Sequence, residues 1–247
     1  MTRRQVERAA HNNAVWCDTV CRAHGVPGAF AGPVWLNHKV PPPYYSNLVV
    51  MSDAGSRKAI VDRIHRLMHR PLAPGWSVKD SFCNLDLARD GFAVLFEASW
   101  LWREPAPHSA RHEPPNLHWS RVASPAELAR WVAIWAGDSG NAEAIGRPSQ
   151  FPASLLADPQ VVFLAGASGE SIVAGGIANQ TAGVVGLSNV FVSGIDETTA
   201  WAALVDGASD AFPGLPLVGY ERDATLNVAR ACGFQPIGPL RVWAHQG

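Results

Sequence analysis

The sequence has no excess of basic residues, few cysteines and no long apolar run, and each of these absences excludes a class of protein. Its 20 Lys and Arg residues balance 21 Asp and Glu residues without a long basic run, so a nucleic-acid partner is not expected. No stretch approaches the roughly 18 consecutive apolar residues of a membrane span. The N-terminus also lacks the apolar core of a secretion signal, so we expect a cytoplasmic protein without a membrane partner.

The four cysteines are too few and too unevenly spaced for a disulfide framework in a chain of 247 residues, and we expect them to be reduced. Cys17 and Cys21 lie four residues apart on a predicted helix, with His24 further along, so the three could supply metal ligands from one face. No fourth ligand stands nearby in the sequence. A buried apolar helix face explains the two cysteines better, and we predict no metal site.

Three common enzyme motifs are also missing. The sequence contains no G-x-G-x-x-G loop opening a helix, no P-loop with Gly-Lys-Ser/Thr, and no G-x-S-x-G nucleophile elbow. It therefore does not favour a dinucleotide-dependent enzyme, a P-loop nucleotidase or an α/β-hydrolase.

A proline-rich segment divides the sequence. Residues 103–116, REPAPHSARHEPPN, contain four prolines and two histidines without apolar periodicity, which is typical of a linker. We therefore predict an N-terminal α+β domain at 1–103, a linker at 104–116 and a second domain at 117–247.

In the N-terminal part, the spacing of apolar residues predicts two helices and four strands. One helix falls at 4–23, and the other follows Ser52 and carries Ile60 and Ile64 on its apolar face. The strands fall at 34–36, 47–51, 77–87 and 92–103. The tetrapeptide Ala-Arg-Asp-Gly at 88–91 predicts a hairpin between the last two strands.

The C-terminal part has the predicted order β, α, α, β, β, β, α, β, α, β. Its first helix begins with Ser124, Pro125 and Glu127, which form a capping box with Pro at the first helical position. A stretch at 137–152 that is rich in Gly, Asn and Pro is long enough for a mobile loop. The other elements are an antiparallel meander at 161–165, 172–179 and 184–192, a helix at 198–211, a strand at 217–220, a helix at 225–232 and a strand at 237–243.

This order of elements resembles the GNAT superfamily of acyl-coenzyme A dependent N-acyltransferases. The resemblance rests on the meander that ends in the sequence Gly186-Leu-Ser-Asn-Val-Phe-Val192, on the helix directly after it, and on the closing strand, helix, Gly233-Phe234 and strand. It implies an α+β fold with a mixed central sheet flanked by helices. It also implies acetyl-coenzyme A or another acyl-coenzyme A as cosubstrate, and an amine of a small molecule or peptide as acceptor.

The resemblance further implies which residues bind the cosubstrate. In the superfamily the fourth strand diverges from the fifth, and the pantetheine arm pairs with its exposed backbone as an added strand would. The diphosphate then lies on backbone amides at the start of the next helix. The matching residues here are Asn189, Val190, Phe191, Val192, Ser193, Gly194 and Ile195, with Asn227 in the last helix.

The predicted diphosphate loop departs from the superfamily, which has a Gly-rich loop with a basic flank. This chain has one glycine there, Gly194, followed by Asp196 and Glu197. Carboxylates at a helix start cap the helix and repel a phosphate, which would weaken binding by roughly one to three decades. A capped helix without a phosphate site is the open alternative.

The catalytic pattern departs as well. The superfamily's tyrosine in the last helix, four residues before the Gly of Gly-Phe, is replaced by Ala229. The fourth strand offers Ser188 and Asn189 in place of an acidic base. Glu221 as base and Tyr220 as proton donor, at the end of the fifth strand, are the remaining candidates. Their alternatives are a carboxylate at a helix start and a core aromatic.

The N-terminal part concentrates polar and aromatic residues, among them Lys79, Asp80 and Glu97, which would either face a substrate or pair with each other. Its order α, β, β, α, β, β resembles a second, degenerate GNAT-like unit, and a tandem arrangement is a hypothesis. Two functions follow: an acyl-coenzyme A dependent N-acyltransferase, or a GNAT-like binding or interaction module that has lost coenzyme A chemistry.

Overall fold

The computed structural model describes residues 2–53, 57–68, 75–105, 117–137 and 149–246. The chain forms two compact units. Unit 1 comprises Met1–Leu101, Tyr220–Asp223 and Pro236–Gly247, and unit 2 comprises Trp102–Gly219 and Ala224–Gln235. These units interleave along the chain, and the domain bounds at 1–103, 104–116 and 117–247 stay a prediction.

Unit 1 contains two helices and six strands among its described residues. They are α1 (Arg3–Ala23), β1 (Ala29–Ala31), β2 (Val34–Leu36), β3 (Leu48–Val50), α2 (Arg57–Met68), β4 (Ser77–Asp80), β5 (Phe92–Arg103) and β11 (Gln235–His245), the last two continuing into unit 2 by one or two residues. The strands follow the order β1-β2-β3-β4-β11-β5. β3 and β4 are parallel, whereas β1 with β2, β2 with β3, and β4 with β11 are antiparallel.

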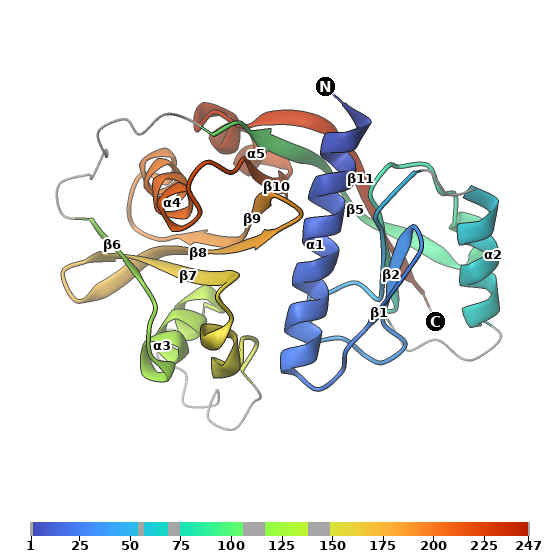
Figure 1. The fold of residues 1–247 in the computed structure, drawn as a ribbon, viewed down its shortest axis with the longest axis horizontal. Coiled ribbons are helices and arrows are strands. Elements are labelled where there is room, and N and C mark those ends of the chain that lie inside the picture. The colour runs from blue at the N-terminus through green and yellow to red at the C-terminus, as the bar shows by residue number, and fades with distance from the viewer. Residues whose placement is uncertain (1, 54–56, 69–74, 106–116, 138–148, 247) are drawn as a thin grey trace. The chain divides into compact units, whose positions relative to one another are not determined.

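The strands β2 and β3 are buried on both faces, which is why they read as continuous apolar runs. In β2, Val34 and Leu36 pack in a cluster with Ile60 and Ile64 of α2, while Trp35 points to the other face, toward α1. Figure 1 shows α1 and α2 on opposite sides of these strands. The predicted helices, and the strands at 34–36 and 47–51, are thus present with similar bounds.

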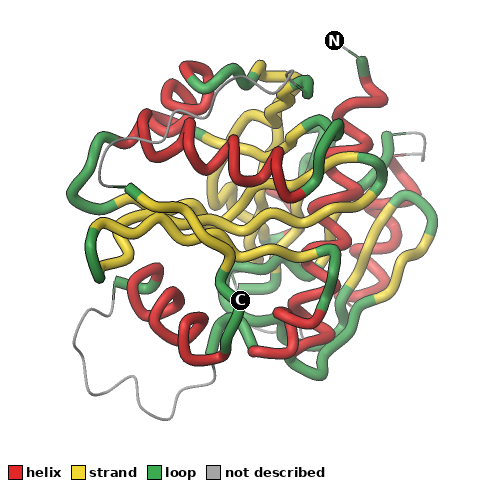
Figure 2. Tube along the Cα trace, turned by 60° about the vertical axis from the view of Figure 1, so that its left-hand side comes forward, coloured by secondary structure: helices red, strands yellow, loops and turns green. Residues whose placement is uncertain are grey.

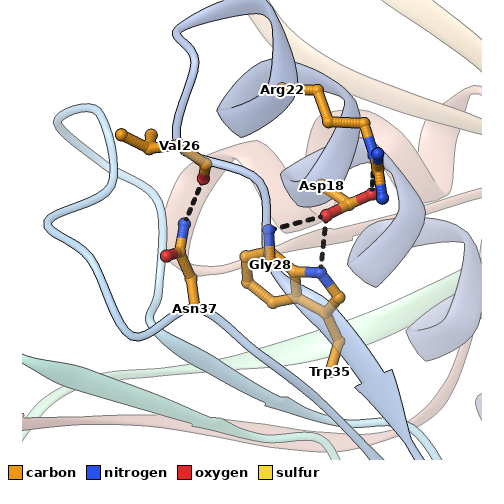
Figure 3. Close-up of polar contacts among 6 residues, drawn as sticks. All are labelled: Asp18, Arg22, Val26, Gly28, Trp35 and Asn37. Atoms are coloured by element: carbon orange, nitrogen blue, oxygen red, sulfur yellow. Dashed lines mark hydrogen bonds and ion pairs between the residues drawn. The ribbon is translucent and has the colours of Figure 1, made fainter.

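A buried carboxylate links α1 to the residue that precedes β1 and to β2 (Figure 3). The Oδ1 atom of Asp18 accepts hydrogen bonds from the Gly28 amide and from Trp35 Nε1, each at 3.0 Å. Arg22, one turn further along α1, donates to the other oxygen of Asp18. Asn37 continues the network by donating to the Val26 carbonyl at 2.7 Å. Because an unpaired buried polar group is costly, each of these bonds fixes the helix against the strands.

The predicted hairpin at 88–91 is wrong. β4 and β5 do not pair with each other, because β11 lies between them. The predicted strand at 77–87 ends at Asp80, and Ala88–Asp90 form a 3₁₀ turn. Gly91 supplies the left-handed residue after that turn, with φ of 79°. The Asp-Gly pair therefore marks a turn, as its chemistry requires, but not a turn between neighbouring strands.

Unit 2 contains three helices and the remaining strands among its described residues. They are β6 (His118–Arg121), α3 (Pro125–Trp135), β7 (Val161–Ser168), β8 (Ser171–Thr181), β9 (Val184–Val192), α4 (Glu197–Ala211), β10 (Leu217–Glu221) and α5 (Asp223–Ala231), with a 3₁₀ turn at Ala153–Ala157. Their order is β10-β9-β8-β7-β6, antiparallel except for β9 with β10. In Figure 2 the strands of this unit form a layer between helices.

The predicted meander of unit 2 is confirmed at 161–168, 171–181 and 184–192, as is the capping box. The Ser124 side chain accepts from the Glu127 amide at 3.2 Å, and the Glu127 carboxylate accepts from the amides of Ser124 and Ala123. Residues 106–116 of the predicted linker and 138–148 of the predicted loop lie outside the described residues. In the described part of the chain, no helix is both long and apolar enough to cross a bilayer.

Candidate active site

A cavity of about 470 Å³ opens in unit 1. Its walls come from the strands β4, β5, β10 and β11 and from the segment that follows the proline triplet at 41–43. The side chains that give it chemical character are Tyr45, Lys79, Phe96, Tyr220, Glu221 and Arg222. Its volume lies within the usual range for small-molecule sites, about 300–1,000 Å³.

Lys79 is a buried cation in the wall of this cavity. Only 4% of the residue is exposed. Its Nζ atom donates to Asn13 Oδ1 of α1 at 2.8 Å and to the Tyr220 hydroxyl oxygen at 3.3 Å, and it lies 4.5 Å from the centre of the Tyr220 ring. All of these partners are neutral. Among the described residues, Lys79 forms no ion pair with a carboxylate.

Tyr220 and Glu221, the predicted proton donor and base, both line the cavity. They lie one residue beyond Leu217 and Val218, the two residues of β10 that pair with β9, with Gly219 between. The Tyr220 ring stacks on Phe96 with centroids 6.4 Å apart and meets the edge of Trp100 at 5.5 Å. Tyr220 is therefore held by aromatic contacts and by Lys79, and both residues remain half-buried at the end of their strand.

Lys79, Asp80 and Glu97 were expected either to face a substrate or to pair with each other, and the structure gives each of them a different role. Lys79 faces the cavity, whereas Glu97 pairs with Arg241 at 2.6 Å. Asp80 is fully buried and accepts hydrogen bonds from the amides of Leu85 and Phe82 in its own loop. Burial raises the pKa of Asp80, and the backbone amides oppose that shift.

In unit 2, the end of β9 has the exposed backbone edge that the resemblance implies. β9 pairs with β10 at Val185 and Gly186, and no further pair of these two described strands follows. On its other side β9 stays paired with β8 as far as Val192. Beyond Gly186, therefore, one edge of β9 has amides and carbonyls that no β10 residue satisfies.

A bulge accompanies this divergence. From Ser188 to Phe191, β9 advances three residues while the paired residues of β8, Ile177 to Gly175, advance two. Asn189 lies in the bulge with φ of 54° in the left-handed region, which Asn tolerates better than most residues. The bulge bends the strand at the residues predicted to bind pantetheine, Asn189, Val190, Phe191 and Val192, all of which are half-buried.

The side chain of Phe191 has a packing role. It meets the edge of Trp131 at 5.1 Å between ring centroids, within a cluster that includes Phe151 and Phe163. A Cβ atom on Gly175 of β8 would lie 2.5 Å from both Phe191 and Trp131, so only glycine fits there. Any contact of Phe191 with a cosubstrate would therefore be made by its backbone.

The predicted diphosphate loop enters α4, and Asp196 caps that helix. Asp196 Oδ2 accepts from the Thr199 amide and hydroxyl, each at 2.7 Å, and these bonds lower the pKa of Asp196. The Ser193 amide donates to the Val173 carbonyl at 2.8 Å. Gly194 is exposed with φ of 73°, and a Cβ there would meet nothing within 4 Å, whereas Ile195 is half-buried. The backbone at Gly194 is thus open, but a carboxylate occupies the first turn beyond it.

The last helix, α5, shows the predicted departure in space. Ala229, in the position of the superfamily's tyrosine, is fully buried, and its carbonyl accepts from the Phe234 amide at 3.1 Å. Asn227, predicted to bind the cosubstrate, is exposed on the same helix in unit 2. Gly233, with φ of 86°, ends the helix as predicted.

The cysteines do not offer a nucleophile. All four are free, and Cys17 and Cys21 lie in the apolar cluster between α1 and the strands β2 and β3. Burial raises the pKa of Cys21 to about 12 and that of Cys83 to about 11, so both stay protonated thiols at neutral pH. Within the described residues, no group of three or more His, Cys, Asp or Glu side chains is arranged to hold a metal ion.

Sequence reasoning missed several residues of the cavity. Asn13 on α1 and Phe96 on β5 were not singled out, although they hold Lys79 and Tyr220 in place. Arg222 was given no role, yet its guanidinium lies 5.3 Å from the centre of the Phe96 ring. The structural sign of this site is a lysine in the short strand Ser77–Asp80, all four residues of which are buried, because an unpaired lysine is rarely buried.

No protein-family model and no curated protein matches the chain. Solved structures do match. A GCN5-related N-acetyltransferase from Kribbella flavida is 15% identical with a TM-score of 0.65, over 97% of this chain and 96% of that one. A functionally unknown conserved protein from Staphylococcus epidermidis is 12% identical with a TM-score of 0.59, over 89% and 93%. A GCN5-related N-acetyltransferase-like protein from Streptococcus suis is 10% identical with a TM-score of 0.51, over 98% of each chain.

These similarities extend over both units, beyond the C-terminal part that carried the resemblance. At such low identity they establish the fold and leave the substrate open. The chain has the α+β fold of the GCN5-related N-acetyltransferases, the GNAT superfamily, as β9, α4 and the closing Gly233 and Phe234 predicted.

Proposed function

We propose that this protein is an acyl-coenzyme A dependent N-acyltransferase that acts on an amine of a small molecule or peptide. The main support is that Tyr220 and Glu221, an acid and a base next to each other in β10, line a 470 Å³ cavity in a chain of this fold. General acid–base catalysis needs both groups within reach of the reacting atoms.

The exposed edge of β9 supports binding of the donor. An extended chain with amide groups, such as pantetheine, can add to a strand edge whose backbone groups have no partner. Val190 to Val192 offer that edge, and the bulge at Asn189 bends the strand where it leaves β10. The backbone of β9 would therefore hold the arm, with little dependence on side-chain identity.

The start of α4 supports donor binding less well. The amides of the first helical turn and the open Gly194 favour an anion. The Asp196 carboxylate already accepts the Thr199 amide, and it would repel a diphosphate. We therefore expect the diphosphate to bind weakly unless Asp196 turns away.

Within the cavity the residues have complementary tasks. When bound, acyl-coenzyme A supplies the thioester whose acyl carbon the amine attacks. Glu221 would accept a proton from the attacking amine, and Tyr220 would give its proton to the departing sulfur. Lys79 donates a hydrogen bond to the Tyr220 oxygen, so its positive charge stabilises the phenolate left after that transfer.

The rival function is a GNAT-like binding module without coenzyme A chemistry. Two observations favour it: the Asp196 cap on α4, and the buried Ala229 in place of the superfamily's tyrosine. The cavity and the exposed edge of β9 favour the enzyme.

Calorimetry with acetyl-coenzyme A tests the proposal, with the Asp196→Ala, Glu197→Ala double variant as comparison. We expect micromolar binding by the wild type and acetyl transfer from acetyl-coenzyme A to an amine panel. Glu170→Gln, on the exposed turn between β7 and β8, is the control for general charge effects. A wild type that does not bind would reject the enzyme in favour of the module, and a gain of at least about tenfold in the double variant would then show that the carboxylates close the diphosphate site.

A further inference from the structure

The cavity in unit 1 contains a charge that the protein itself leaves uncompensated. Lys79 is 4% exposed, and two of its three N–H bonds have partners among the described residues, Asn13 and Tyr220. Both partners are neutral oxygen atoms. Burying an ammonium is unfavourable unless an anion compensates it, so a cation in the wall of a cavity is suited to an anionic ligand.

Arg222 is a weaker candidate for the same task. Its guanidinium stacks over Phe96, and it lies 3.7 Å from the Asp223 carboxylate with 58% of its side chain exposed. A solvent-exposed cation that already has a carboxylate nearby gains little from a further anion. Lys79 therefore dominates the recognition of a negative charge in this cavity.

The rest of the wall defines the other parts of a ligand. Tyr45, Phe96 and Tyr220 offer aromatic surface, and Tyr44 joins them at the rim in a left-handed conformation, φ of 71°, that is uncommon for a bulky residue. Glu221 supplies a negative group in the same cavity. A ligand with an apolar body, one carboxylate and one amine would match all three features.

We propose that this cavity binds an amino acid, or a compound with the same three groups, with its carboxylate on Lys79, its amine toward Glu221 and an apolar or aromatic body against the tyrosines. The inference that the cavity binds such a ligand depends only on the geometry of unit 1. Only its role as the acceptor site rests on the proposed acyltransferase function. The acceptor class then narrows from amines in general to amines that carry a carboxylate.

Calorimetry with three matched compounds tests this on the full chain without coenzyme A. They are L-phenylalanine, L-phenylalaninamide, which lacks the carboxylate, and 3-phenylpropionate, which lacks the amine. We expect phenylalanine to bind about ten- to a hundredfold more tightly than the amide, because the amide loses a charge-assisted hydrogen bond to Lys79. We also expect it to bind more tightly than 3-phenylpropionate, which lacks the amine. This comparison needs no variant, so it does not depend on how a variant folds.

Lys79→Met tests whether Lys79 causes the preference for the acid over the amide. Lys58→Met, on the exposed side of α2, is its matched control. Lys79→Met should bind phenylalanine and its amide equally, whereas Lys58→Met should keep the wild-type preference. Lys79→Gln replaces Lys79→Met if circular dichroism shows that the latter is unfolded. Three results would overturn the proposal: equal binding of acid and amide by the wild type, a preference for the acid that survives in the Lys79 variant, or no binding of any compound at about 10 mM. That concentration is about ten times the upper end of typical KM values, roughly 1 mM.

Failure of this inference and failure of the proposed function give different results. Phenylalanine binding without acetyl transfer would reject the acyltransferase and keep the site. Transfer to benzylamine and to phenylalanine at the same rate would keep the acyltransferase and reject the carboxylate preference.

Discussion

In unit 2 the surface that could hold a donor is made by the backbone of β9, whereas in unit 1 the cavity is made by side chains that come from several elements. At β9 the side chain of Phe191 is used for packing, and the bulge at Asn189 shapes the edge. In the cavity, Lys79 and Glu221 supply charge directly. A surface made by backbone tolerates many sequences, while a cavity made by side chains depends on particular residues. Substitutions should therefore alter chemistry in unit 1 and packing in unit 2.

The largest effect should come from the base. Glu221→Gln should lower the rate of acetyl transfer about 10²- to 10⁴-fold, because an amide cannot accept the amine proton. A steady-state assay with acetyl-coenzyme A measures the rate, and Glu170→Gln on the exposed turn after β7 serves as control. An unchanged rate in Glu221→Gln would remove this residue from the mechanism.

The second test addresses how unit 1 holds its shape. Asp18→Ala should lower the free energy of unfolding by about 2–5 kcal/mol, because it leaves the Gly28 amide and Trp35 Nε1 buried without an acceptor. Asp18→Asn is the matched control. Both donors bond the same oxygen, Oδ1, which Asn retains, so its loss should be the smaller of the two. Urea denaturation followed by tryptophan fluorescence measures both, and equal losses would show that the charge matters more than the hydrogen bonds.

The third test addresses packing in unit 2. Gly175→Ala should lower the free energy of unfolding by about 1–3 kcal/mol, because its Cβ would lie 2.5 Å from Phe191 and Trp131. Gly207→Ala in α4 is the opposite case: its Cβ would contact Leu164 at an ordinary 3.5 Å, and Ala favours a helix. In thermal unfolding, Gly175→Ala should therefore lower Tm, whereas Gly207→Ala should raise it. A stable Gly175→Ala variant would mean that the aromatic cluster is loosely packed.

The smallest effect concerns pH. Burial raises the pKa of Asp80, so the folded state binds its proton more tightly than the unfolded state does. Stability should therefore fall as pH rises from the unfolded value near 3.9 to the raised value. Glu127 and Asp196, whose pKa values are lowered, have the opposite effect: they make stability rise with pH, and that rise ends near their unfolded values of about 4. Urea titrations from about pH 4 upward should show this decline in the wild type, and Asp80→Asn should lose it. The same slope in both proteins would mean that another group causes the decline.

Local chemistry was enough to predict most of unit 2. The capping box at Ser124, the β-branched meander and the Gly233 turn depend on neighbours within a few residues, and each is present. The edge of β9 followed from the resemblance, and the structure has the divergence that it implied.

Unit 1 was harder to predict because its contacts are distant in sequence. The three-residue strand β1 was missed, since a run so short has no period to detect. The hairpin at 88–91 was wrong because β11, about 150 residues later, takes the place beside β4. The hydrogen bonds of Lys79 to Asn13 and Tyr220 likewise join residues far apart in the chain, and no local sequence pattern predicts them.

The position of β11 also has a consequence for folding during synthesis. Trp243 of β11 belongs to the same apolar cluster as α2 and β2, and β11 pairs with β4 through Arg241 to Ala244. Most of unit 1 leaves the ribosome first, yet its sheet and core cannot close until the last strand has been made. The edges of β4 and β5 must therefore wait unpaired while all of unit 2 is translated, so the part of the protein that is synthesised first completes its folding last.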